Sequence, residues 1–240
     1  LRYTVFNICR FIRNLSLRHC FTHNVGRELV LSKYHADGEG MSAVKPKQSR
    51  KGNREKLMNA ALELLAEDQS GLAGISLRRI TKACGLSPPA FYGHFASMEE
   101  LGLALVSDVG STLRALLKGV RDADTEAAVV TASVQAAFTY IRGNEALFIL
   151  IARERAGSSA LIRGAIRNEV RQIVEEMASD FHERGLFERF SLPEKRAAVA
   201  AIVSLGLSLI PDLLDVSRES SAEGDAILAE FEYQVQFILS

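Results

Sequence analysis

The sequence predicts an all-α protein, and three observations support this prediction. From residue 53 almost to the end of the chain, apolar residues recur at three- and four-residue spacing, which is typical of helices with one buried face. Short stretches with glycine, serine or aspartate separate these segments and mark helix ends. No convincing alternation of apolar and polar residues, the pattern of a half-buried strand, competes with the helical one.

The first forty residues differ from the rest of the chain. Residues 1–40 lack steady periodicity, and Arg10 and Arg13 stand where a signal peptide would be apolar. Met41 then opens a polar, basic segment of the kind that often starts a bacterial protein. We expect residues 1–40 to be an N-terminal extension that is non-native or disordered, and a short amphipathic arm is the alternative.

The first predicted helix begins near Asn53 and ends in the acidic, glycine-containing turn 67–74. Its apolar face comprises Leu57, Ala60, Ala61, Leu64 and Leu65. Another helix is expected to start at Ser97, which forms a capping-box pattern with Glu100 three residues later.

Between them, residues 76–84 and 87–95 predict two short helices, each opened by a serine suited to capping. The turn that joins them is centred on Gly85, where a positive φ costs little only for glycine. Leu77, Ile80, Ala83 and Leu86 are expected to face inward and meet Phe91 and Phe95, with the small Ala83 allowing close approach. This is a helix-turn-helix pattern, whose second helix enters the major groove of DNA.

The outward residues of this pair and the basic segment before it suit DNA binding. Helix N-termini bind phosphates, polar side chains on the second helix fix its register, and small residues can face base edges. A flexible basic arm can follow the phosphates or enter the minor groove. The expected DNA-binding residues are Lys47, Arg50, Lys51, Arg54, Ser76, Arg78, Ser87, Pro89, Ala90, Tyr92, Gly93 and His94. The alternatives are an ordinary packed helix pair and a solvated basic tail.

The formal net charge of zero hides an asymmetry along the chain. Residues 41–101 carry nine basic and six acidic side chains, whereas residues 102–240 carry fourteen and twenty. Only the first of these parts is therefore suited to a polyanionic partner.

The rest of the chain predicts six longer helices, near 98–120, 124–142, 144–154, 158–184, 193–216 and 222–239. The helix over 193–216 is rich in alanine, glycine and serine among larger aliphatic residues. Two such helical hairpins related by a two-fold axis would bury it in a four-helix bundle, and an ordinary buried helix is the alternative. Polar residues and Pro211 interrupt its apolar run, so no membrane span is expected.

Other functional classes lack their motifs in this sequence. We find no Gly-x-Ser-x-Gly, no His-Glu-x-x-His and no glycine-rich phosphate loop, so we predict no enzyme and no catalytic residue. Cys9 and Cys20 lie near His19 and His23, but the spacing matches no familiar zinc pattern, and neither a metal nor a cofactor is expected. The few scattered cysteines fit a cytoplasmic protein.

The stretch from Leu77 to Leu101, with its Phe-Tyr-x-His-Phe signature and following Glu-Leu, resembles the TetR family of DNA-binding regulators. The resemblance implies a nine-helix fold in a homodimer that binds a palindromic operator. It also implies a basic arm and helix-turn-helix domain over 41–97, followed by a helical effector-binding and dimerisation domain over 98–240. The sequence departs from the family at Arg79, which is often acidic, and at Gly93, which is often larger or charged.

A second segment, Ala146–Ala160, resembles the FabR/DesT-type repressors of unsaturated fatty-acid synthesis, as do residues 100–103 and 166–170. The resemblance implies a long-chain acyl-CoA or acyl-ACP effector. A pocket between bundle helices suits an apolar chain, and arginine suits the phosphates of CoA. The expected ligand residues are Phe138, Phe148, Leu150, Arg153, Arg155, Leu161 and Ile166.

Three alternatives stay open at this point. The apolar ligand residues can be ordinary core, and the arginines can form an ion-pair network with Glu154. The effector can be a xenobiotic or another small hydrophobic molecule. More distantly, the chain can be a helical enzyme that acts on acyl groups, although its motifs give no support for one.

Overall fold

A computed structural model describes residues 50–68, 71–119, 125–216 and 221–240, including all side chains in these ranges except those of Arg50, Lys51 and Ser221. The predicted extension 1–40, Lys47, and the side chains of Arg50 and Lys51 lie outside the described residues.

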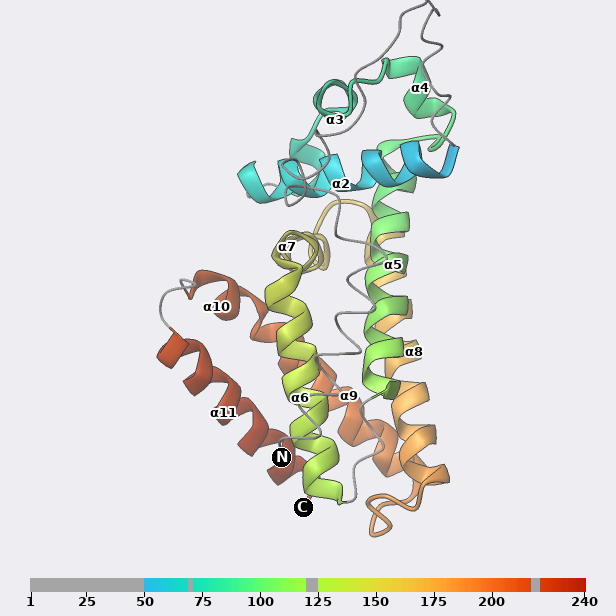
Figure 1. Cartoon of the computed structure of the whole chain (residues 1–240). Helices are drawn as coiled ribbons and strands as arrows, with labels where there is room; N and C mark the ends of the chain where they lie inside the picture. Colours follow the sequence, from blue (N-terminus) through green and yellow to red (C-terminus); the bar gives the residue numbers. More distant parts are fainter. Residues whose placement is uncertain (1–49, 69–70, 120–124, 217–220) are drawn as a thin grey trace, which may run out of the picture. The chain divides into compact units, whose positions relative to one another are not determined.

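Every regular element within the described ranges is helical, which confirms the all-α prediction (Figure 1). The elements are α2 (Arg50–Asp68), η1 (Leu72–Gly74), α3 (Leu77–Ala83), α4 (Pro88–Tyr92), α5 (Met98–Gly119), α6 (Glu126–Gly143), α7 (Glu145–Glu154), α8 (Ala160–Glu183), α9 (Leu192–Ser208), α10 (Ile210–Asp215) and α11 (Ser221–Ile238). When α9 and α10 are taken as one broken helix, the α-helices of the described part follow the predicted nine-helix arrangement.

The predicted helix over 193–216 is two helices rather than one. α9 ends at Ser208 and α10 begins at Ile210, and the Leu209 N–H bonds the carbonyls of two successive residues, both at 3.2 Å. Pro211 causes the break because it has no N–H for the preceding turn and its ring crowds that turn's carbonyl.

Helices α2, α3 and α4 and the start of α5 form the α2–α4 core, which is one end of a hydrophobic core that continues through the rest of the described helices. Its fully or almost fully buried side chains are Leu57, Ala61, Leu65, Ile75, Ile80, Phe91, Phe95 and Leu101. The rings of Phe91 and Phe95 lie at its centre, with centroids 5.6 Å apart. This packing holds α4 against α2 and α3, so the position of α4 depends on the two aromatic rings.

The inward face of α3 differs from the prediction at two positions. Ala83 is exposed, and Thr81, which was not expected inside, is 1% exposed. A threonine hydroxyl is tolerated there because Oγ1 hydrogen-bonds to the carbonyl oxygens of Leu77 and Arg78 at 3.1 and 3.2 Å. Close approach of α3 to its neighbours therefore does not depend on Ala83, and that expectation was wrong.

The remaining helices form a bundle in which α6 lies between α11 and α5 (Figure 1). α5 packs along α8, α8 along α9, and α6 against α11. Phe138 of α6 meets Phe231 of α11 with ring centroids 5.9 Å apart. The buried residues of α6 are Val129, Val130, Ala132, Ser133, Val134, Ala136, Phe138 and Ile141, which lie around most of its circumference.

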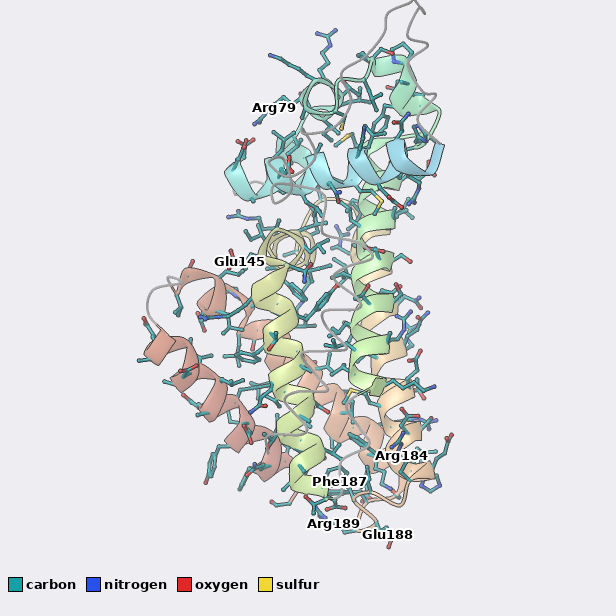
Figure 2. All side chains as sticks on the ribbon, viewed as in Figure 1. Arg79, Glu145, Arg184, Phe187, Glu188 and Arg189 are labelled. Carbon is teal, nitrogen blue, oxygen red and sulfur yellow. The ribbon has the colours of Figure 1, made fainter. Side chains whose placement is uncertain are left out.

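The connection between α8 and α9 contains a backbone conformation that residues other than glycine rarely adopt. Phe187 has a φ of 55° and yet is 2% exposed. Its N–H donates to the Glu126 carboxylate at the start of α6, and its ring packs edge-on against Phe181 with centroids 5.1 Å apart. Arg189 lies over the Phe187 ring and donates to Glu126 and to the Ser240 carbonyl (Figure 2). These contacts tie the ends of α6, α8 and α11 together.

Candidate nucleic-acid interface

Helices α3 and α4 form the helix-turn-helix that the sequence predicted. Ser76 caps α3, because its Oγ accepts a hydrogen bond from the Arg79 N–H at 3.3 Å. The chain reverses at Gly85, which has a φ of 65°, and the Leu86 N–H donates to the Thr81 carbonyl at 2.8 Å. This pattern is a left-handed helix end of the kind that glycine permits.

Replacing Gly85 with alanine is expected to lower the free energy of unfolding by about 1–2 kcal/mol through backbone strain. A Cβ at Gly85 would meet no atom within 4 Å, so crowding adds nothing to this penalty. Gly143 is a matched control, because its Cβ would also meet nothing within 4 Å and its φ is not left-handed. Urea unfolding should show a clear loss for Gly85→Ala and none for Gly143→Ala; equal losses would contradict the assigned turn.

The second helix of the pair, α4, presents an exposed face. Tyr92 is 62% exposed although the neighbouring Phe91 is fully buried, and the two rings meet in a T-shaped arrangement with centroids 5.7 Å apart. Of the predicted DNA-binding residues with described side chains, Arg54, Ser76, Arg78, Ser87, Pro89, Tyr92 and Gly93 are exposed, and Ala90 and His94 are half-buried. The structure therefore leaves this set available to a partner, and their DNA contacts stay predictions.

Two members of the set also have local roles. The Arg54 guanidinium lies over the Phe95 ring, 4.9 Å from its centroid, and Nη1 is 3.3 Å from the Met58 sulfur. Gly93 follows the last residue of α4 with a φ of −74°. Because Gly93 lies outside the helix interior, it does not incur the cost of a mid-helix glycine.

Arg79, where the sequence departs from the family, pairs with Asp68 at the end of α2 (Figure 2). Arg79 Nη2 lies 3.2 Å from Asp68 Oδ1, and a second contact joins Nη1 to Oδ2. The hydrogen bond from Arg79 holds the pKa of the exposed Asp68 carboxyl below its ordinary value. The stabilisation that this pair contributes is therefore fully present above the ordinary carboxyl pKa. It is lost as the pH falls through the lowered pKa of Asp68. An arginine thus replaces the expected capping acid and ties α3 to α2.

The predicted ligand residues separate into two groups. Phe138, Phe148, Leu150 and Ile166 are buried inside the bundle, whereas Leu161 is 61% exposed and Arg153 and Arg155 are exposed. Leu161 therefore lies on the surface and not in an interior tunnel. Glu154, between the arginines, is buried and accepts a hydrogen bond from the Leu72 N–H, and this bond replaces the expected network with its neighbours. The ligand role of these residues stays a prediction.

Helices α9 and α11 leave much apolar surface exposed. In α9 only Lys195 and Val199 are buried, although most of this helix is apolar. On α11, Tyr233 and Phe237 are 70% and 73% exposed, and neither was singled out from the sequence. The stretch Leu192–Asp215 is long and apolar enough to cross a membrane by length and composition alone, with 17% of its apolar window buried. We call the exposed residues Ala197, Ala201, Ser204, Ser208, Ala226, Ala229, Tyr233 and Phe237 the α9–α11 surface.

Comparison with known proteins finds one family model that matches part of the chain and several structures with a similar fold. Residues 57–105 match the family model of bacterial regulatory proteins of the tetR family. The structure is similar to the fatty acid degradation regulator FadR from Bacillus halodurans, with a TM-score of 0.64, 16% identity, and 81% of this chain and 97% of that chain covered. FadR from Bacillus subtilis, in complex with stearoyl-CoA, gives a TM-score of 0.58, 14% identity, and coverage of 77% and 97%. A tetR-family regulatory protein from Rhodococcus RHA1 gives a TM-score of 0.58 at 21% identity, with 80% of this chain and 98% of that chain covered.

The matched segment runs from the middle of α2 through the helix-turn-helix into α5. At these identities the similar structures establish the shared fold, and their ligands remain properties of those proteins. Proteins of this kind generally bind DNA and are not enzymes. Residues 57–105, which contain the helix-turn-helix, thus match the tetR family model, and the described chain shares its fold with a regulatory protein of that family.

Proposed function

We propose that this protein is a homodimeric, cytoplasmic repressor of fatty-acid genes, those of unsaturated fatty-acid synthesis in particular. In this proposal it binds a palindromic operator through α3 and α4 and responds to a long-chain acyl-CoA or acyl-ACP. The exposed face of α4 over the buried Phe91 and Phe95 is the observation that supports DNA binding most directly. An exposed tyrosine and helix N-termini suit phosphates, and Pro89 and Gly93 leave room for base edges.

The α9–α11 surface supports the homodimer. Exposed aromatic residues such as Tyr233 and Phe237 are enriched at the centre of protein interfaces. A two-fold axis would bring the same surface of two chains together and allow α9 and α11 of each to form a four-helix bundle. Two recognition helices then face two half-sites, as a palindromic operator requires. Burial in this interface also accounts for the apolar stretch Leu192–Asp215 without a membrane.

A lipid effector is supported by one relative and by the bundle interior. FadR from Bacillus subtilis, which shares this fold, is in complex with stearoyl-CoA. In this chain Phe138, Phe148, Leu150 and Ile166 supply buried apolar side chains to the bundle. An acyl chain would pack against such residues, while Arg153 and Arg155, at the surface, are free to meet phosphates.

The effector would act by favouring one spacing of the two recognition helices over another. A ligand with equal affinity for both spacings shifts nothing, however tightly it binds. We therefore expect saturated and unsaturated thioesters to differ in their effect on DNA binding, with unsaturated ones tightening it and saturated ones loosening it.

The test is binding of the full chain to DNA from upstream of its own and neighbouring genes, with oleoyl-CoA, with palmitoyl-CoA and with neither. The proposal predicts DNA binding that the two thioesters change by at least about tenfold relative to each other, as expected for a coupling free energy of common size. Binding that ignores both thioesters would remove the lipid effector and leave a regulator of another small molecule. No binding to any of these DNA fragments would contradict the proposed targets.

A further inference from the structure

One buried carboxylate joins the effector helices to the DNA-binding helices. Glu154, the last residue of α7, is 6% exposed. Its Oε1 accepts a hydrogen bond from the Leu72 backbone N–H at 2.8 Å, across 82 residues of sequence. Leu72 is the first residue of η1, and its N–H has no partner inside that short helix. Glu154 therefore caps η1 from the other domain.

Three glycines surround this contact, and each leaves space that a neighbour fills. A Cβ at Gly71 would lie 2.7 Å from Glu154 Oε1, and a Cβ at Gly157 would overlap Oε2. A Cβ at Gly102 of α5 would lie 2.6 Å from Leu72 Cδ2. A Cβ at any of the three positions would therefore require the neighbouring Glu154 or Leu72 side chain to shift. We call Glu154, Leu72 and these glycines the glycine joint.

The joint lies immediately before the helix-turn-helix. Leu72 is four residues from Ser76, which caps α3, and the Ile75 N–H donates to the Leu72 carbonyl at 3.3 Å. Close by in sequence, Ser159 caps α8 and donates from Oγ to the Glu99 carboxylate at the start of α5. The segment between α7 and α8 therefore holds both the entry to the helix-turn-helix and its exit into α5.

We propose that Glu154 is a positioning residue for DNA reading, which fixes α3 and α4 relative to the effector helices through the cap on η1. A palindromic operator accepts only one spacing of two recognition helices. If α3 and α4 were released from α7, they would therefore bind the operator more weakly. The DNA part of this proposal rests on the proposed function, whereas the structural part does not.

A double-mutant cycle isolates the contact. Gly71 has a φ of −68° and a ψ of 177°, a conformation open to alanine, and among the described residues, its chain neighbours aside, Glu154 holds the atoms within 4 Å of its Cβ position. Gly71→Ala should therefore push the carboxylate away and weaken DNA binding about tenfold, as Glu154→Ala does. In the Glu154→Ala background the same substitution should cost less than about twofold, because the clash is gone.

Two further variants separate positioning from general damage. Glu154→Gln keeps an oxygen that accepts from Leu72 and should bind DNA within about threefold of the wild type. Glu183→Ala removes an exposed glutamate at the end of α8 and should change nothing. Dimer content by light scattering should be the same in all variants.

Amide hydrogen exchange at Leu72 tests the joint without DNA. The Leu72 amide should exchange at least about tenfold faster in Glu154→Ala and in Gly71→Ala than in the wild type or Glu154→Gln. Unchanged exchange, or a Gly71→Ala loss of the same size with and without Glu154, would overturn the proposal. If the wild type bound no DNA but the exchange pattern held, the joint would stand and the proposed function would fail.

Discussion

Replacing Tyr233 and Phe237 together with glutamate is expected to give a monomer and to weaken operator binding by at least about a hundredfold. Both side chains are more than two-thirds exposed in the single chain, on one face of α11 with Ala226 and Ala229. In a dimer the two rings would bury large apolar areas, whereas two glutamates would bring unpaired charge into the interface. A monomer holds one half-site only and loses the gain from binding both.

Leu161 provides the matched control for this prediction. It is 61% exposed and apolar like the two aromatic residues, but it lies on α8 outside the α9–α11 surface. Leu161→Glu should leave the dimer unchanged, together with the operator affinity that it has in the absence of effector. Light scattering and fluorescence anisotropy with a labelled operator measure the two properties on the same samples. A Tyr233→Glu, Phe237→Glu variant that stays dimeric would place the interface elsewhere.

Phe91→Ala is expected to lower the free energy of unfolding of the α2–α4 core by about 3–5 kcal/mol. Phe91 is fully buried, and its ring packs against Phe95 and against the edge of Tyr92. Whole domains are stable by only about 5–15 kcal/mol, so this loss should unfold or loosen the helix-turn-helix and abolish DNA binding. The bundle formed by α5–α11 should remain dimeric.

A substitution at the adjacent Tyr92 distinguishes an effect on DNA binding from an effect on stability. Tyr92→Ala removes a side chain that is 62% exposed and should change the free energy of unfolding by less than about 1 kcal/mol. It should nevertheless weaken operator binding, because the hydroxyl can no longer reach a phosphate. Chemical unfolding should therefore distinguish the two variants, because only Phe91→Ala loses stability, whereas operator binding should be weakened in both. A stable Phe91→Ala protein that binds DNA normally would contradict the assigned core.

The helix-turn-helix could be predicted from the sequence because its signals are local. Serines at helix starts, Gly85 in the turn and the spacing of Phe91 and Phe95 specify the elements without knowledge of distant contacts. Pro211 was recognised as an interruption of the apolar run, but the helix break that it causes was not predicted. The face of α3 was misjudged because threonine can bury its hydroxyl by bonding its own helix.

Contacts between distant segments could not be predicted in this way. Glu154 meets Leu72 across 82 residues, whereas the sequence suggested for Glu154 only a network with its neighbours Arg153 and Arg155. From the sequence, Arg79 only interrupts a capping-box pattern, and its ion pair with Asp68 was not predicted. In both cases the partner is fixed by helix packing, which the local pattern does not encode.

A footprint of the full chain on its operator tests the central claim most directly. A homodimer that reads DNA through α4 should protect two half-sites whose centres lie about one helical turn or a multiple of it apart, with a two-fold symmetric pattern. Tyr92→Ala should weaken protection equally at both. Protection of a single site without symmetry, or none on any fragment bound by the protein, would contradict the account of a dimeric helix-turn-helix regulator.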